Sequence, residues 1–187
     1  MRTCHRLLII SALLLSSSFG SAQQPAVRRT PRFFTPVASV KDIMEAVLEP
    51  ATEVISDAVA PADLPNGVLE KAPASDDEWT AVRNSAIVMS EGANLLVMGG
   101  RRISSGAPES ATAARAARRE RVELMPKIAA RVARSQDRWR GLAQALIAAG
   151  AVTLRAVDAR DAKALLDAGN VIDAACENCH HEYWYPY

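Results

Sequence analysis

Residues 162–184 read AKALLDAGNVIDAACENCHHEYW, and this stretch decides how the 187-residue chain is interpreted. Small and apolar side chains recur in it every three or four residues, which is the period of one helix face. Asp158 or Asp161 can cap such a helix at its start. The face consists of Leu165, Ala168, Gly169, Ile172, Cys176, Cys179 and His180. The stretch therefore predicts an amphipathic helix whose buried face carries two thiols and an imidazole.

The pentapeptide CENCH, residues 176–180, gives this face its chemistry. C-x-x-C-H is the attachment sequence of c-type haem, in which the two thiols form thioethers with the haem vinyl groups. The histidine that follows can ligate the iron from the proximal side. We therefore expect one haem c per chain, attached covalently through Cys176 and Cys179 and ligated by His180.

Three other uses of the cysteine pair have to be weighed against haem attachment. An exported pair can form a disulfide, and the spacing alone does not exclude this. A zinc site would need two more ligands, and only His181 remains in the mature chain. A thioredoxin-like dithiol would follow a strand of a βαβ unit, and the sequence contains no such pattern.

Residues 1–22 have the pattern of a cleavable export signal. Two arginines precede the apolar run of residues 7–15, LLIISALLL, which is too short to span a bilayer easily. Small residues then lead to an expected cleavage point near Ala22–Gln23, which removes Cys4. We expect a periplasmic protein with no stable membrane anchor after cleavage. An uncleaved anchor is the alternative.

The charge of the mature chain excludes some partners. Cleavage removes two of the 22 basic residues and none of the 21 acidic ones, which leaves the remainder close to neutral. A near-neutral chain lacks the overall charge that favours nucleic acid, so we expect no nucleic-acid partner. About 165 residues suffice for one domain with one core.

The first helix is expected after an extended leader, residues 23–38, which contains three prolines. Ser39 can cap a helix whose apolar residues follow helical spacing through residues 40–59. Pro50 lies inside this run and removes one helix hydrogen bond. We expect a kink there and no termination, because the apolar pattern resumes in phase. The proline-containing stretch 61–67 ends the helix.

The second helix is predicted from the capping box of Ser75 and Glu78 to about Met98, where Gly99–Gly100 ends it. Residues 101–125 are polar and rich in arginine, and we interpret them as a long, partly mobile connection. This connection is either a solvated linker or a basic contact for an acidic partner.

The third helical region is expected to begin near Pro126, with a separate short piece through Arg134 followed by a stronger helix over residues 137–157. Together with the helix over 162–184, the pattern predicts an all-α fold. We expect residues 39–187 to form one antiparallel four-helix bundle with the haem on its C-terminal helix.

In its motif and helix order the chain resembles the class II cytochromes c, the cytochrome c-prime group. Members of that class attach haem on the last helix of a four-helix bundle. The resemblance covers about residues 39–185 and rests on three stretches. These are SVKDIMEAVLEP (39–50), DDEWTAVRNSAIVMSEGANLLVM (76–98) and DAGNVIDAACENCHHEYWYP (167–186). The extended region 101–138 departs from the class.

The resemblance also implies a residue for the other face of the haem. In the class that residue comes from the first helix, and it is a methionine in low-spin members or a non-coordinating apolar residue in high-spin members. Met44 occupies the matching place, and methionine is an established axial ligand of c-type haem. Met44 can equally be core packing. Met89, Met98 and Met125 are further candidates, and an open iron site is the remaining alternative.

The function expected from these features is one-electron transfer by an exported haem protein with His/Met ligation, which is not an enzyme. Its partners would be redox proteins, and a homodimer is compatible with the resemblance. The alternative is a protein that binds NO or CO at an open distal site. Peroxidase-like chemistry would need a distal histidine, and the mature chain has none to spare.

Overall fold

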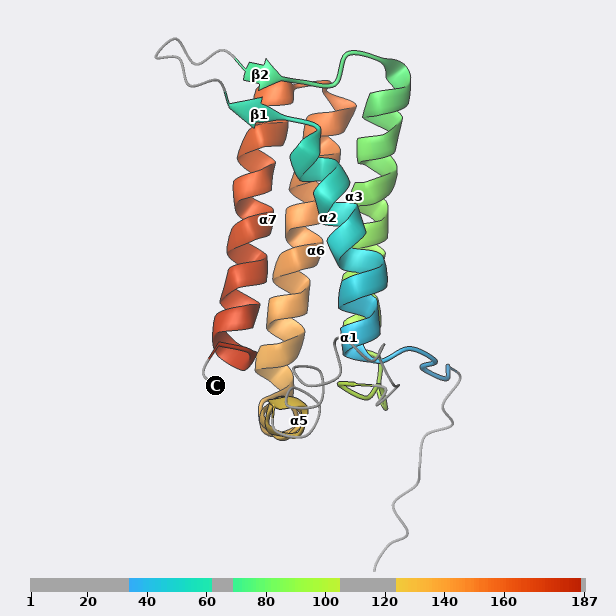
Figure 1. The fold of residues 1–187 in the computed structure, drawn as a ribbon, viewed down its shortest axis with the longest axis vertical. Coiled ribbons are helices and arrows are strands. Elements are labelled where there is room, and N and C mark those ends of the chain that lie inside the picture. Colours follow the sequence, from blue (N-terminus) through green and yellow to red (C-terminus); the bar gives the residue numbers. More distant parts are fainter. Residues whose placement is uncertain (1–33, 62–68, 105–123, 186–187) are drawn as a thin grey trace, which may run out of the picture. The chain divides into compact units, whose positions relative to one another are not determined.

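The computed structural model describes residues 34–61, 69–104 and 124–185 (Figure 1). These residues are predominantly helical, which confirms the prediction of an all-α fold. Residues 34–187 form one compact unit. The predicted export signal (1–22), most of the leader and residues 105–123 of the polar connection lie outside the described residues.

The first helical segment consists of three consecutive parts, α1 (Val40–Ile43), the π-helix η1 (Met44–Leu48) and α2 (Glu49–Asp57). Ser39 caps it as predicted. The Asp42 N–H donates to the Ser39 hydroxyl at 3.2 Å, and the Ser39 N–H donates to the Asp42 carboxylate at 2.7 Å. This reciprocal pair satisfies two amide groups that a helix start would otherwise leave unpaired.

The helix continues through Pro50, and the expected disturbance takes the form of a π-helical turn. Proline has no N–H to donate to the carbonyl four residues earlier, and its ring collides with that carbonyl in a regular α-helix. In the turn before it, the Glu49 N–H donates to the Met44 carbonyl, five residues back. The wider turn accommodates the proline, and the buried residues Ile43, Leu48 and Ile55 remain on the inner face.

Two very short strands follow, which the sequence analysis did not predict. β1 (Ala60–Pro61) pairs antiparallel with β2 (Leu69–Lys71). Helix α3 (Asp76–Leu96) then begins with the predicted capping box, in which the Glu78 carboxylate accepts from the Ala74 and Ser75 amides at 2.6 and 3.0 Å. These backbone hydrogen bonds lower the pKa of Glu78. The helix ends two residues before Met98.

The start of the polar connection is fixed to the first helix, so the solvated-linker interpretation is wrong for residues 101–104. The Arg102 and Ile103 carbonyls accept from the Val40 and Lys41 amides at 2.8 and 3.0 Å. The Arg101 guanidinium donates to the Ala38 carbonyl at 2.5 Å and to the Leu95 carbonyl at 2.6 Å. These bonds join the end of α3 to the first turn of α1 and pair further amides at that helix start.

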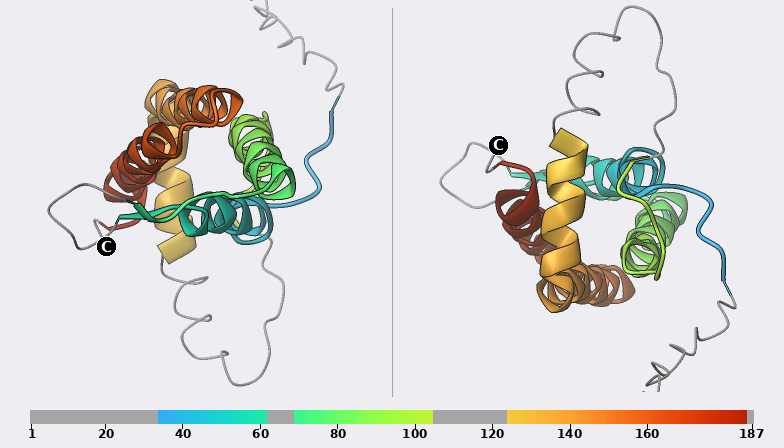
Figure 2. Two further views of the ribbon diagram at one scale, coloured as in Figure 1. Left: turned by 90° about the horizontal axis from the view of Figure 1, so that it is seen from above. Right: turned by 90° about the horizontal axis from the view of Figure 1, so that it is seen from below.

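The remaining described elements are α5 (Met125–Arg134), α6 (Gln136–Asp158) and α7 (Ala162–Tyr183). Pro126 lies in the first turn of α5, and α5 is a separate short helix, as predicted. Asp161 caps α7 by accepting from the Ala164 amide at 2.9 Å. In the views along the long axis of the fold, α5 runs across one end of the long helices (Figure 2).

The long helices share one core. Helix α6 contacts α3 and α7, and α2 also contacts α3 and α7. Neighbouring segments run in opposite directions along the long axis (Figure 1). Helix α6 is long and apolar enough to cross a membrane by composition alone, but core helices share that property, and its buried face belongs to the common core.

Gly150 lies at a tight contact between α6 and α3. A Cβ atom built on Gly150 would collide with the Ser90 hydroxyl and lie 3.3 Å from the Met89 methyl group. The Ser90 hydroxyl is held in place because it donates to the Ala86 carbonyl at 2.7 Å. Gly141, on the same helix, faces open space.

Gly150→Ala should therefore lower the free energy of unfolding by about 1–3 kcal/mol, because an added methyl group overpacks this contact. Gly141→Ala is the matched control and should raise stability by up to about 1 kcal/mol, since alanine is the better helix former. Urea denaturation measures both. In the Ser90→Ala background the cost of Gly150→Ala should shrink, and an unchanged cost would show that the hydroxyl does not set the helix separation.

Candidate functional site

The inner face of α7 is the one expected from the sequence. Leu165, Ala168 and Ile172 are buried in the core. Cys176, Cys179 and His180 continue the same face, half-buried, toward the C-terminal end of the helix. The first half of α7 thus packs into the core, and the motif in its second half borders a cavity.

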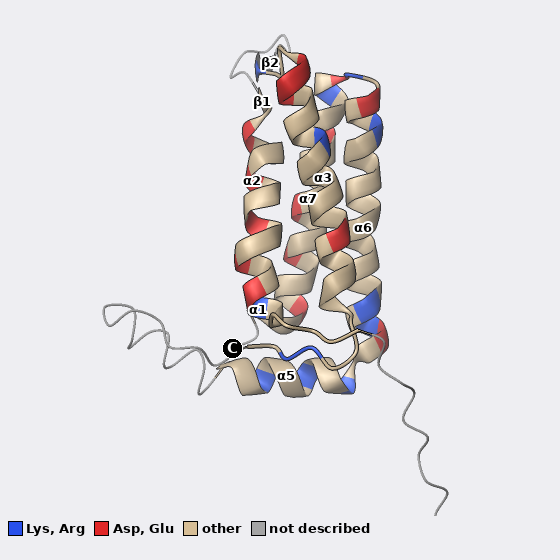
Figure 3. Cartoon of the chain, turned by 90° about the vertical axis from the view of Figure 1, so that its right-hand side faces the viewer, with Lys and Arg blue, Asp and Glu red and all other residues tan. Residues whose placement is uncertain are grey.

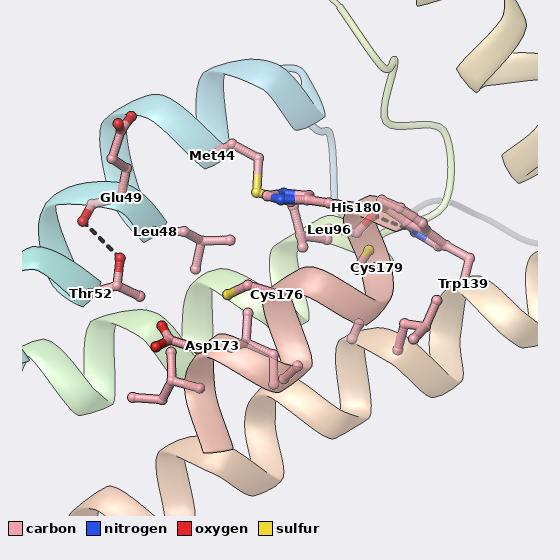
Figure 4. Close-up of a pocket in the computed structure, with 15 residues that line it drawn as sticks. Met44, Leu48, Glu49, Thr52, Leu96, Trp139, Asp173, Cys176, Cys179 and His180 are labelled. Atoms are coloured by element: carbon pink, nitrogen blue, oxygen red, sulfur yellow. Dashed lines mark hydrogen bonds between the residues drawn. The ribbon is translucent and has the colours of Figure 1, made fainter. Parts of the chain in front are cut away.

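That cavity, of about 390 Å³, lies between α7, α6 and the first helical segment. Four residues predicted from the sequence line it together, namely Met44, Cys176, Cys179 and His180. Figure 4 shows the Met44 thioether and the His180 imidazole pointing into the same space from different helices. Most other lining residues are apolar, among them Leu48, Leu96, Leu142, Leu146 and Ile172. Size and lining are those of a site for a small organic ligand or cofactor.

A second cavity of about 490 Å³ adjoins the first. It extends toward α5 and the chain end, and Met125, Ile128, Tyr183, Trp184 and Tyr185 contribute to it. Both cavities share Met44, Trp139, Cys179 and His180 in their lining. Met44 and His180 therefore stand between two apolar spaces, and a flat ligand held between these side chains would have room on both sides.

The π-helical turn explains why Met44 reaches this position. Met44 is its first residue, and Leu48 at its end is buried against α3. A Cβ atom on Gly92 of α3 would lie 2.7 Å from a Leu48 methyl group, so the two helices meet closely there. Leu48 and Met44 both line the first cavity. π-Helical turns occur often at functional sites, because they redirect side chains without breaking the helix.

The two thiols are free in the structure and do not resemble those of a redox-active dithiol. Burial raises the pKa of Cys176, and the neighbouring Asp173 and Glu177 carboxylates raise it further. Burial likewise raises the pKa of Cys179 to about 11. Reactive C-x-x-C pairs lie at helix N-termini and have depressed pKa values, whereas this pair lies in the last two turns of α7.

A zinc site at the cysteine pair would need further ligands nearby, and the part of the chain that the structure describes does not provide them. No group of three or more His, Cys, Asp and Glu side chains there could hold a metal ion. His181 points away from the cavity lining, with its side chain 70 % exposed and its Nε2 atom 3.6 Å from a Glu177 carboxylate oxygen. Cys176, Cys179 and His180 therefore share one environment, the apolar cavity that all three line.

Trp139, within the helix predicted over residues 137–157, was not predicted as a site residue, yet it lines both cavities. Its indole N–H donates to the Leu96 carbonyl at 3.2 Å, and its ring meets Tyr183 edge-on with centroids 5.1 Å apart. Trp139, Leu142 and Leu146 are three and four residues apart and so lie on one helix face, which could have predicted that Trp139 lines the cavity. The Trp139–Tyr183 pair fixes the end of α7, three residues beyond His180.

Polar residues at the edges of the site were also missed. Glu49, Thr52 and Asp173 line the first cavity away from the chain end (Figure 4). Glu49, Thr52 and Asp173 became candidates only once the helices were placed together. Lys41 lines the second cavity, and its ammonium group pairs with the Glu45 carboxylate.

Comparison of the chain with models of protein families, with curated proteins and with solved structures found no match. What the site can do therefore has to be argued from the residues that line it.

The anchor at the end of α7 can be tested through Tyr183. Its hydroxyl lies 2.9 Å from the Ser135 hydroxyl, which itself donates to the Arg131 carbonyl. Tyr183→Phe should lower the free energy of unfolding by about 0.5–1.5 kcal/mol through loss of this hydrogen bond. Tyr183→Leu should cost a further ~1 kcal/mol, because it also loses the edge contact with Trp139.

Tyr185→Phe is the control for these urea titrations. Its hydroxyl donates to the Glu177 carboxylate at 3.2 Å on the exposed surface, so its loss should change stability by less than about 0.5 kcal/mol. Equal effects at the two tyrosines would contradict the assignment of Tyr183 as the anchor.

Proposed function

We propose that this chain is an exported c-type haem protein of the class II cytochrome c kind, an antiparallel four-helix bundle that carries one electron at a time. One observation supports this above all others. Met44 lies in the first helical segment and the C-x-x-C-H motif lies in the last helix, yet all four predicted residues line one apolar cavity.

Each residue has a defined part in the proposed site. Cys176 and Cys179, which are free thiols in the structure, would hold the cofactor through thioether bonds. His180 and Met44 would ligate its iron. Haem c, once bound, supplies the one-electron couple of its iron. The surrounding leucines, Ile172 and Trp139 keep water away from this centre.

The position of Met44 supports one of the two functions that the sequence leaves open. Ligation of the iron by both His180 and Met44 would leave no open coordination position, which favours electron transfer over binding of a gas. Methionine also stabilises the reduced iron, because a soft thioether prefers Fe(II). The only described side chains that line both cavities are Met44, Trp139, Cys179 and His180, and Met44 alone among them comes from the first helical segment.

The first test concerns covalent attachment. Protein exported through a cytochrome c maturation system should keep its haem through acid–acetone extraction and SDS gel electrophoresis, because thioether bonds survive both treatments. Cys176→Ala and Cys179→Ala should each weaken retention, and the double variant should abolish it. Haem staining of the gel gives the result.

Cys4→Ser is the matched control. Cys4 lies in the expected export signal, so this variant should leave haem retention unchanged. Complete loss of haem from the wild-type protein in this assay would refute the c-type assignment.

The second test concerns Met44. Met44→Leu keeps an apolar side chain of similar size and removes only the sulfur ligand. The wild type should be low-spin, slow to bind CO, and show the weak near-infrared band of Met–Fe(III) ligation. The variant should be high-spin, bind CO or NO readily, and have a lower reduction potential. Absorption spectroscopy and redox titration measure these changes.

Met125→Leu is the control, because Met125 lines the second cavity but lies on α5. Its spectrum should match that of the wild type. A wild-type protein that is already high-spin and unaffected by Met44→Leu would make gas binding the better-supported function.

A further inference from the structure

Positive charge gathers at the end of the fold that carries α5 (Figure 3). The cations there are Lys127, Arg131, Arg134, Arg138 and Arg140, here called the basic end. Asp137 pairs with Arg140 at 2.8 Å, and Glu182 lies 4.0 Å from Arg131 and 3.7 Å from Arg138. Residues 124–140 carry five cations and one carboxylate, and Glu182 of α7 adds a second carboxylate, so α5 and the start of α6 have a positive excess. Glu45, beside the second cavity, and Glu177, which accepts from Tyr185, reduce this excess.

Arg101 and Arg102 add two cations at the adjoining end of α3.

The opposite end of the fold is acidic. Helix α3 begins there with three consecutive acids, Asp76–Glu78. Cations at this end are engaged in ion pairs, such as Arg160 with Asp76 at 2.6 Å and Arg83 with Asp158 at 3.5 Å. The charges are thus separated along the long axis, and such a separation orients a charged partner as it approaches.

The basic end lies beside the second cavity. Met125 and Ile128, on the inner side of α5, line this cavity together with His180. Trp184 and Tyr185 line it as well, and they are 39 % and 51 % exposed. Tyr185 packs edge-on against His180 and His181, and its hydroxyl donates to the Glu177 carboxylate. Tryptophan, tyrosine and arginine are the residues that protein interfaces favour.

The structure also favours a protein partner over a membrane surface. A basic helix that binds lipid inserts an apolar face into the bilayer. The apolar residues of α5, Met125, Ile128 and Val132, are instead 4, 4 and 7 % exposed and pack into the fold. Helix α5 therefore offers its cationic face to the outside, which suits a partner that presents carboxylates.

We propose that the basic end, together with the exposed Trp184 and Tyr185 of the adjoining cavity, is the docking surface for an acidic electron-transfer protein. The partner's carboxylates would meet the cations of α5 and α6, beside the cavity that His180 lines. This inference rests on the proposed function for the kind of partner, but the surface itself is defined by charge and exposure.

The test is a titration of the isotopically labelled full-length protein, exported and matured, with a flavodoxin chosen for its strongly negative net charge. Amide shifts in NMR spectra should cluster on α5, the start of α6 and residues 184–185. Affinity should fall as ionic strength rises from about 10 mM to about 0.5 M, since exposed charges are then screened. The double variant Lys127→Glu/Arg134→Glu should weaken binding by about tenfold or more.

The matched control is Arg155→Glu/Lys163→Glu, which changes the net charge equally but lies on α6 and α7 toward the acidic end. It should leave affinity within about twofold of the wild type, because its charges are farther than a Debye length from the interface. Equal losses in both double variants, or shifts on another face, would overturn the proposal. Binding to phosphatidylglycerol vesicles in place of flavodoxin would do the same and would assign the surface to a membrane.

Haem staining of the same samples separates this inference from the proposed function. A sample without covalent haem would contradict the proposed function, while its flavodoxin titration would still decide whether the basic end binds an acidic protein.

Discussion

The rest of the site depends on one helix serving two purposes, since α7 is both a core element and the carrier of the C-x-x-C-H motif. A spacing of three residues between the thiols, with the imidazole directly after the second, keeps all three groups on the face that packs inward. The first half of that face is buried in the core, where α7 packs against α6, and Leu165 and Ala168 belong to it. The second half finds no such closure and borders the two cavities.

The first helical segment faces α7 and contains a π-helical turn in its backbone. Pro50 cannot donate to the carbonyl four residues earlier, and the π-helical turn before it accommodates the proline within a continuous helix. The same turn sends Leu48 into the space that Gly92 leaves on α3, and it brings Met44 to the cavity. One proline therefore affects both the packing against α3 and the identity of the side chain that faces His180.

The sequence predicted those features that depend on short-range physics. The caps at Ser39, Ser75 and Asp161 follow from side chains that pair with nearby amides, and the α7 face follows from its periodicity. The π-helical turn was not predicted, because it arises from competition between a proline and distant packing. The contacts of Arg101 and the cavity role of Trp139 join elements far apart in sequence, and periodicity carries no information about such pairs.

The same division between local and long-range information applies to charge, because net charge does not reveal how the charges are arranged on the folded chain. A mature chain near neutrality predicts no strong field, and it argues against nucleic acid. Folding nevertheless places the cations of α5 and the start of α6 at one end and the acidic start of α3 at the other. A neutral protein can thus present a local field where α5 closes the fold beside His180. Because fields act over about 10 Å in salt, the local arrangement and not the net charge governs which partner can approach that end.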